Sequence, residues 1–135
     1  MVQRKAKRFG SVSRLDSFTR GYLEAAPWSS TYQKEEGGDD IPMDDDFDLI
    51  DIAPETVKQA EKDCAAFQEY NADDLEEAGL PDEEAGHLFW LNRNGHGVGF
   101  WDRPGGAVGK RLSDASHDYG SVDLYVSDDG KVYGT

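Results

Sequence analysis

His96 lies in the glycine-rich segment 92–97, Asn-Arg-Asn-Gly-His-Gly, and carries a side chain suited to acid–base chemistry. An imidazole titrates near neutral pH and can act as a general base. An acid such as Asp102 can orient it, and Arg93 or Arg103 can bind phosphate. This grouping would suit a small hydrolase centred on His96. Exposed turns, however, commonly carry polar residues, and no partner motif accompanies the histidine. We therefore expect that His96 is not catalytic and that the protein is not an enzyme.

Residues that could bind a metal or a cofactor form no complete motif. The acids at positions 44, 45, 46 and 48 partly follow the spacing of a calcium loop, but its sixth position holds Leu49 instead of glycine. His87 and His117 have no partner at the spacing of a zinc site. The alternating glycines of residues 95–99 lack the phosphate-binding GxGxxG pattern and its βαβ context. We expect no metal and no cofactor.

Acidic residues are concentrated in one part of the chain. The net charge is −14, and residues 35–84 alone carry twenty Asp or Glu against two Lys, a net charge of −18. Residues 1–20 carry a net charge of +5. A field of this kind repels nucleic acid and attracts basic surfaces. Carboxylates on a loop and a helix can imitate a row of phosphates in a Lys/Arg-lined channel. The acidic candidates for partner binding are Asp39, Asp40, Asp44, Asp45, Asp46, Asp48, Glu61, Glu69 and Asp73.

Two aromatic runs flank the segment that contains His96. Leu88-Phe89-Trp90-Leu91 precedes it and Val98-Gly99-Phe100-Trp101 follows it, and the Asn-Gly step between them predicts a β-hairpin. Adjacent strand residues face opposite sides, so one aromatic residue of each pair should enter the core and the other should be exposed. An exposed aromatic side chain can anchor a protein partner. Trp90, Arg93, His96 and Trp101 therefore join the candidates for partner binding.

The elements that must position these residues follow from hydrophobic spacing. A first helix is predicted from Asp16 or Ser17 to Ala26, ended by Pro27, with Trp28 as a core aromatic at the helix end. A second helix begins at Pro54 and fades over residues 71–78. Its apolar stripe, against which we expect the hairpin to pack, consists of Val57, Ala60, Cys64 and Phe67. A third helix is predicted over residues 107–119.

The remaining segments complete an α+β domain. Residues 122–126 alternate as a half-buried strand, residues 128–130 form a turn, and residues 131–133 return as a short strand. The expected fold is a small antiparallel β-sheet of two hairpins packed against about three helices. Residues 1–15 are predicted to be a basic flexible arm, and residues 16–135 a single domain with an acidic loop at about 33–51.

Cys64 and the hydropathy pattern bear on location. A single cysteine excludes an internal disulfide and fits a reducing cytosol, and its place on the apolar stripe predicts a small buried hydrophobe. No apolar run approaches the roughly 18 residues of a membrane helix. We expect a soluble protein in the cytoplasm of a host cell, without contact to a membrane.

Several segments resemble a family of small uncharacterised proteins encoded by bacteriophages and related mobile elements. The resemblance is carried by the motif FWLxRNGHGxGFWDR at residues 89–103, by residues 18–26 and 51–56, and by the ending Asp-Leu-Tyr-Val-Ser-Asp-Asp-Gly-Lys at 123–131. It covers most of the chain from about Asp16 onward and leaves out the basic arm. The resemblance implies a phage origin and brings no catalytic residues with it.

These observations favour a phage accessory protein. Its acidic, DNA-mimicking surface would inhibit a host defence protein, of the anti-restriction or anti-CRISPR type, or another protein with a basic nucleic-acid-binding surface. One alternative is an accessory factor that binds nucleic acid directly through the basic arm and the aromatic hairpin. The other is the small hydrolase centred on His96.

Overall fold

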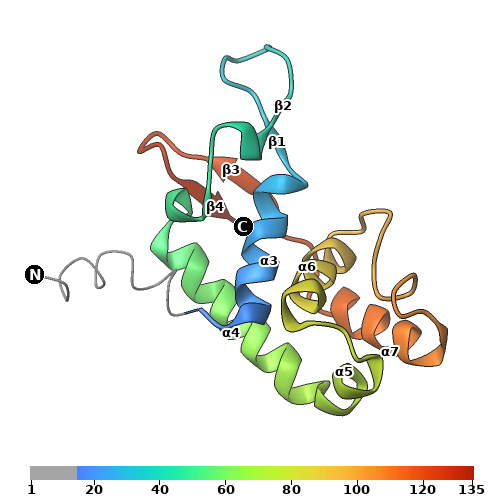
Figure 1. The fold of residues 1–135 in the computed structure, drawn as a ribbon. Coiled ribbons are helices and arrows are strands. Elements are labelled where there is room, and N and C mark those ends of the chain that lie inside the picture. The colour runs from blue at the N-terminus through green and yellow to red at the C-terminus, as the bar shows by residue number, and fades with distance from the viewer. Residues whose placement is uncertain (1–14) are drawn as a thin grey trace, which may run out of the picture.

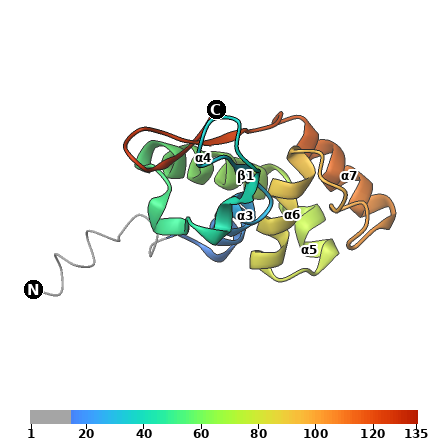
Figure 2. The ribbon, with the colours of Figure 1, turned by 90° about the horizontal axis from the view of Figure 1, so that it is seen from above.

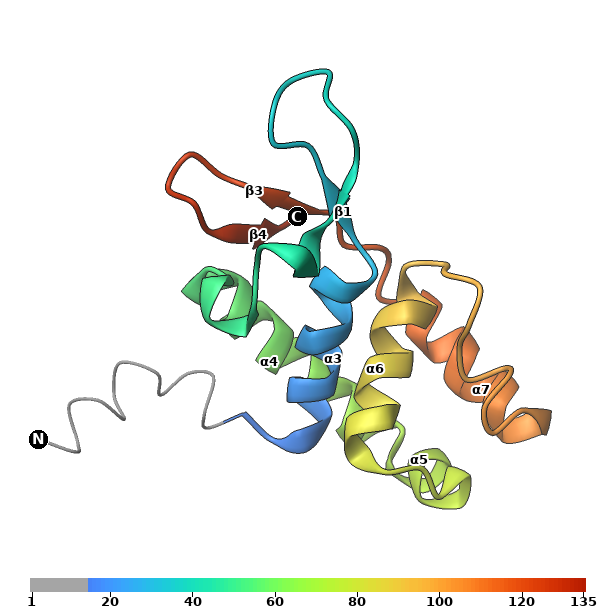
Figure 3. The ribbon, with the colours of Figure 1, turned by 45° about the horizontal axis from the view of Figure 1, so that its top comes forward.

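Four helices lie side by side in the order α4, α3, α6 and α7 in the computed structural model, which describes residues 15–135 (Figure 3). Their bounds are α3 Ser17–Trp28, α4 Pro54–Tyr70, α6 Asp82–Arg93 and α7 Gly106–His117. The short helix α5 (Ala72–Ala78) links α4 to α6 and packs against α7 (Figure 1). No helix in residues 15–135 combines the length and the apolar composition that are needed to cross a bilayer.

Helices α3 and α6 approach each other closely because each places a glycine at the crossing. A Cβ atom on Gly21 would collide with the backbone carbonyl of Glu83, and one on Gly86 would collide with the carbonyl of Phe18. The backbones of the two helices therefore meet at a distance that no larger residue permits at these two positions.

Asp16 fixes the start of α3, since its side chain accepts a hydrogen bond from the backbone N–H of Thr19 at 2.8 Å.

The core of the helical layer is built from aromatic rings. Phe67 of α4 stacks on Phe89 of α6 with ring centroids 4.1 Å apart, and Phe100 lies 5.9 Å from Phe67 on a stacked ring plane. All three side chains are fully buried. The predicted stripe of α4 is buried, including Cys64, whose burial raises the pKa of the thiol. The aromatic segment thus packs on the stripe, although it does so as a helix.

Two short antiparallel ribbons lie at one end of the helices. β1 (Thr31–Tyr32) pairs with β2 (Ile41–Pro42), and β3 (Leu124–Val126) pairs with β4 (Val132–Gly134). After α7 the chain crosses the helices to the N-terminal end of α4 (Figure 2), where the Ala53 N–H donates to the carbonyl of Val132 at 2.8 Å. The α+β class is therefore confirmed, with two 2-stranded sheets among the described residues.

The β-hairpin predicted around His96 is wrong. Residues 88–93 belong to α6, and the Asn-Gly step ends this helix instead of turning a hairpin. Gly95 adopts a positive φ of 70°, and the N–H of His96 donates to the carbonyl of Leu91 at 3.0 Å, which is a helix C-cap of the Schellman type. Residues 98–103 form turns, so they contribute no second strand. The structure does contain a second two-stranded sheet besides that of β3 and β4, but β1 and β2 form it.

The other expectations agree with the structure only in part. Pro27 lies inside the last turn of α3, and Trp28 is 57% exposed instead of buried in the core. The acidic loop at 33–51 contains β2 and two single-turn 3₁₀ helices, η1 (Met43–Asp45) and η2 (Leu49–Asp51). The helix expected over residues 107–119 is present as α7. The basic arm at residues 1–15 lies outside the described residues except for Leu15, which is buried.

Candidate functional site

The polar residues of the aromatic motif hold the fold together from inside. Asn92 is 3% exposed and connects two elements. Its amide Nδ2 donates to Ser113 Oγ of α7 at 2.9 Å, and its Oδ1 accepts the backbone N–H of Phe100 at 2.8 Å. Gly99 must be glycine here, because a Cβ atom would collide with the Asn92 side chain. Asn92 therefore fixes the loop after α6 against α7.

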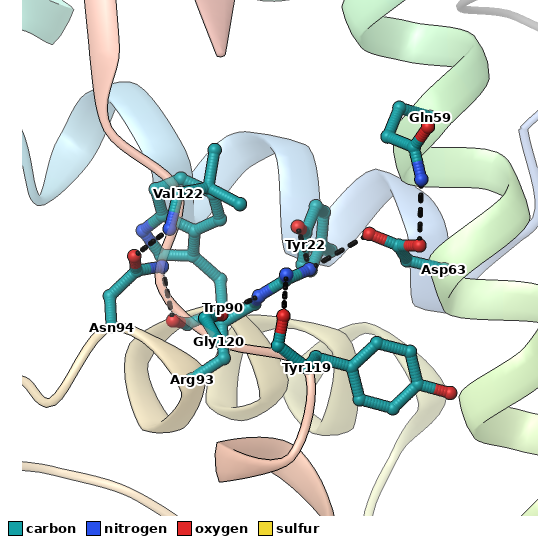
Figure 4. Close-up of polar contacts among 9 residues, drawn as sticks. All are labelled: Tyr22, Gln59, Asp63, Trp90, Arg93, Asn94, Tyr119, Gly120 and Val122. Atoms are coloured by element: carbon teal, nitrogen blue, oxygen red, sulfur yellow. Dashed lines mark hydrogen bonds and ion pairs between the residues drawn. The ribbon is translucent and has the colours of Figure 1, made fainter. Parts of the chain in front are cut away.

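Arg93 makes the densest set of contacts in this part of the molecule (Figure 4). Its guanidinium donates to Asp63 Oδ2 of α4 at 2.9 Å and to the Tyr22 hydroxyl of α3 at 3.0 Å. It also donates to two backbone carbonyls after α7, Gly120 at 2.7 Å and Tyr119 at 2.8 Å. The Arg93 side chain is only 4% exposed. It joins three helices to the C-terminal segment and is not available to a partner.

Asn94 and Trp90 complete this internal network. Asn94 Oδ1 accepts the backbone N–H of Val122 at 2.7 Å, and its Nδ2 donates to the carbonyl of Trp90 at 2.9 Å. Trp90 is 2% exposed, and its indole N–H donates to Ser29 Oγ at 2.8 Å. The structure thus places Trp90 and Arg93, two of the predicted partner-binding residues, inside the protein. Both are corrections to the sequence-based site.

A cavity of about 580 Å³ lies beside Arg93, between α3, α4 and the C-terminal segment. The carboxylate of Asp63, which also accepts a hydrogen bond from Gln59 Nε2 at 2.9 Å, faces it together with Tyr22. Burial raises the pKa of the Tyr22 phenol, so this hydroxyl stays protonated. The charges of Arg93 and Asp63 compensate each other within a hydrogen-bonded pair, and the exposed Glu55 also lines the cavity.

Two of the predicted partner-binding residues of the motif, His96 and Trp101, are exposed. Trp101 is 54% exposed, whereas its neighbour Phe100 is fully buried, as expected for one aromatic residue of each pair. The first pair departs from that expectation because Phe89 and Trp90 are both buried. His96 is exposed and lines a separate hollow with Asn94. Arg93 is bonded elsewhere, and Arg103 forms an ion pair with Glu84, so the structure does not assemble these arginines around His96.

The predicted acidic residues are all exposed, but they fall into two groups. The first lies in the loop before α4 and contains Asp39, Asp40, Asp44, Asp45, Asp46 and Asp48. Glu69 and Asp73 lie near the opposite end of α4, and Glu61 lies between on its outer surface. A helix of 17 residues is roughly 25 Å long at 1.5 Å per residue. The structure therefore separates the loop acids from Glu69 and Asp73.

Four of the loop acids, Asp44, Asp45, Asp46 and Asp48, border a second hollow of about 600 Å³, which we call the acidic hollow. It lies between the C-terminal end of α3 and the η1–η2 segment. Its carboxylates belong to Glu24, Asp44, Asp45, Asp46, Asp48 and Asp51, and its rings to Trp28, Phe47 and His87. Within residues 15–135, no group of three or more His, Cys, Asp or Glu side chains is placed to hold a metal ion.

Several acids around the acidic hollow are already committed to local structure. Asp48 caps η2, where its Oδ1 accepts the N–H of Leu49 at 2.7 Å. Asp46 accepts a hydrogen bond from the Tyr32 hydroxyl and pairs with Lys34 at 3.6 Å. Asp44 and Asp45, by contrast, form none of the hydrogen bonds or ion pairs found among the described residues. Their charges are therefore the least compensated in this group.

Comparisons with known proteins returned no matching family model, no matching curated protein and no matching solved structure.

Trp28, Glu24 and His87 line the acidic hollow but were not among the partner-binding residues predicted from the sequence. Trp28 directly follows a proline near the end of an apolar helix, and this context predicts a core residue. Only the position of the η1–η2 segment, which no local pattern gives, reveals that the ring faces an acidic hollow.

Proposed function

We propose that this chain is a phage-encoded accessory protein that inhibits a host defence protein, of the anti-restriction or anti-CRISPR type, or another nucleic-acid-binding protein. It acts in the host cytoplasm by presenting an acidic surface where the target would bind DNA. The phage origin rests on the resemblance of the motif at residues 89–103 and of the ending at 123–131. The acidic surface is the loop at 39–48, and no catalytic step is involved.

The observation that carries this proposal is the uncompensated charge of the loop. Asp39, Asp44 and Asp45 are exposed and form none of the hydrogen bonds or ion pairs found in residues 15–135. Charges that are not used for folding remain available to a partner. A basic channel would be attracted to them over a range set by the Debye length, about 8 Å at physiological salt. Exposed carboxylates along a loop can in this way replace the phosphates of DNA.

Phage growth on defended bacteria tests the proposal. The chain is expressed in hosts that carry a restriction or CRISPR system, and the plating efficiency of a targeted phage is measured. Wild type should restore plating, whereas the triple variant Asp39→Asn, Asp44→Asn, Asp45→Asn should not. The matched control is Glu61→Gln, Glu69→Gln, Asp73→Asn, which also removes three exposed charges but lies outside the loop, on α4 and α5, and should retain inhibition. Melting curves of both variants should match wild type because none of these side chains is needed internally.

A binding assay separates this proposal from direct recognition of nucleic acid. The purified chain should compete with duplex DNA for the inhibited defence protein, and its association rate should fall as salt is raised. The opposite pattern would be tight binding of oligonucleotides by the chain itself. If that binding survives the triple variant and disappears on deletion of residues 1–14, the chain is a nucleic-acid-binding factor and the proposed inhibition is wrong.

A further inference from the structure

Trp28 is a large aromatic ring placed at the mouth of the acidic hollow. Trp28 is 57% exposed, although the three residues before it in α3 are buried. The ring lies against His87 of α6, with ring centroids 5.0 Å apart and planes inclined by 55°. Exposed aromatic surface beside a hollow is typical of a binding site. His87 supports one side of the indole, which leaves the remaining ring surface open to a ligand.

Negative charge exceeds positive charge around this ring. Six carboxylates line the hollow, and the described cations that act on them are Lys34, paired with Asp46, and Arg20, whose charge acts on Glu24. Burial raises the pKa of Glu24, and the charges of Glu83 and Asp48 raise it further. Burial also lowers the pKa of His87, so its ring is neutral at pH 7 and adds no competing charge.

We propose that the acidic hollow accepts an arginine side chain of the partner protein, with its guanidinium stacked on Trp28 and hydrogen-bonded to the neighbouring carboxylates. This inference rests on the proposed function, because the inhibited protein would supply the arginine from the channel that binds DNA. Three observations converge on it: the open indole face, the excess of carboxylates, and a volume of about 600 Å³ that is not arranged for a metal.

The chemistry of the hollow favours arginine over lysine. A guanidinium is planar, stacks on aromatic faces and is less strongly hydrated than an ammonium group. Both cations can donate hydrogen bonds to Asp44 and Asp45, whose carboxylate oxygens are bonded to no other described residue. A lysine ammonium would gain the same attraction to the acids but little from the ring geometry. The Trp28 ring therefore determines the preference between the two, whereas the acids set the overall affinity for cations.

Nuclear magnetic resonance with two small probes tests this preference. N-acetyl-arginine amide and N-acetyl-lysine amide are titrated into the labelled full chain, and the Trp28 indole signal and the backbone amides of residues 44–48 are followed. The arginine probe should bind about two- to fivefold more tightly, as expected for a cation–π contact at an exposed site. Trp28→Ala, followed through the amides, should reduce this ratio to about one. Trp101→Ala removes another exposed tryptophan and should leave the ratio unchanged.

Neutralisation of the acids gives an independent readout. Asp44→Asn with Asp45→Asn should weaken binding of both probes by a similar factor, because the acids act on charge and not on shape. Equal affinity for the two probes in wild type, or an unchanged ratio in Trp28→Ala, would overturn the arginine assignment. Phage plating then shows which proposal has failed. If Trp28→Ala still inhibits while the Asp39/Asp44/Asp45 variant does not, only the arginine site is wrong. If the probes discriminate but that triple variant still inhibits, the proposed function is wrong.

Discussion

Replacement of Arg93 by methionine should strongly destabilise the fold. The change removes hydrogen bonds to Tyr22, Asp63, Tyr119 and Gly120 while retaining an apolar side chain of similar length. It leaves a carboxylate and two backbone carbonyls without their donor. Removing one partner of a buried ion pair costs about 3–5 kcal/mol. The Asp63 side chain is 16% exposed and keeps some contact with water, so we expect the lower end of this range, about 3 kcal/mol.

Urea unfolding followed by circular dichroism measures this loss directly. For a chain of this length, about 3 kcal/mol corresponds to a decrease in melting temperature of roughly 10 °C. Arg93→Lys keeps the charge but cannot reproduce the planar set of donors, and it should fall between wild type and Arg93→Met. The control is Arg103→Met, since Arg103 pairs with Glu84 at the surface with its side chain 60% exposed. Its effect should stay within about 1 kcal/mol.

A loss of less than about 1 kcal/mol in Arg93→Met would refute the structural role assigned to this residue. The double variant Arg93→Met with Asp63→Leu provides a second check. It should lose less stability than the sum of the single variants, because the carboxylate that needs the guanidinium is then absent. Arg93→Lys should retain inhibition under conditions where it is folded, because residue 93 is buried and lies outside the proposed binding surface.

Three further predictions concern the core, the helix crossing and pH. Phe89→Ala should cost about 3–5 kcal/mol in urea unfolding, whereas Trp101→Ala, on the exposed side of the same motif, should stay within about 0.5 kcal/mol. Gly86→Ala should lower the melting temperature more than Gly95→Ala, because only Gly86 meets the backbone of another helix; a larger effect at Gly95 would contradict the close crossing. Burial acts to raise the pKa of Asp16, but its helix-cap hydrogen bonds outweigh burial and lower the pKa below 3.8. The stability from this cap should therefore be complete above about pH 4 and lost as the pH falls through the lowered pKa, and Asp16→Ala should flatten that part of the stability curve.

The amphipathic helices could be predicted from the sequence because each keeps a polar side. Pro54 and the stripe from Val57 to Phe67 define α4, and the bounds of α7 follow from the same reasoning. The strand of residues 124–126 and its return also agree with the predicted alternation. In these elements the hydrophobic period reports directly on which residues face the core.

Helix α6 escaped prediction because it is buried on nearly every side. Residues 85–93 are almost all buried, so their hydrophobic pattern has no polar stripe and resembles a buried strand. The acids at its start, Asp82, Glu83 and Glu84, are the signal that favours a helix, since they match the positive end of its dipole. The acidic hollow could not be predicted from the sequence either. The exposure of Trp28 depends on where the η1–η2 segment lies, and the spacing of residues in the sequence does not predict that position.

The contacts of Arg93 also have a consequence for the order in which the chain completes its fold during synthesis. The ribosome synthesises α3, α4 and α6 before it adds Tyr119 and Gly120, whose carbonyls accept two of the guanidinium's hydrogen bonds. Until those residues emerge, the nascent helices must leave this cation in water or hold it with incomplete partners. The helical layer therefore reaches its final stability only when the last segment arrives, and a ribosome stalled before Tyr119 would present an unfinished domain to cellular proteases.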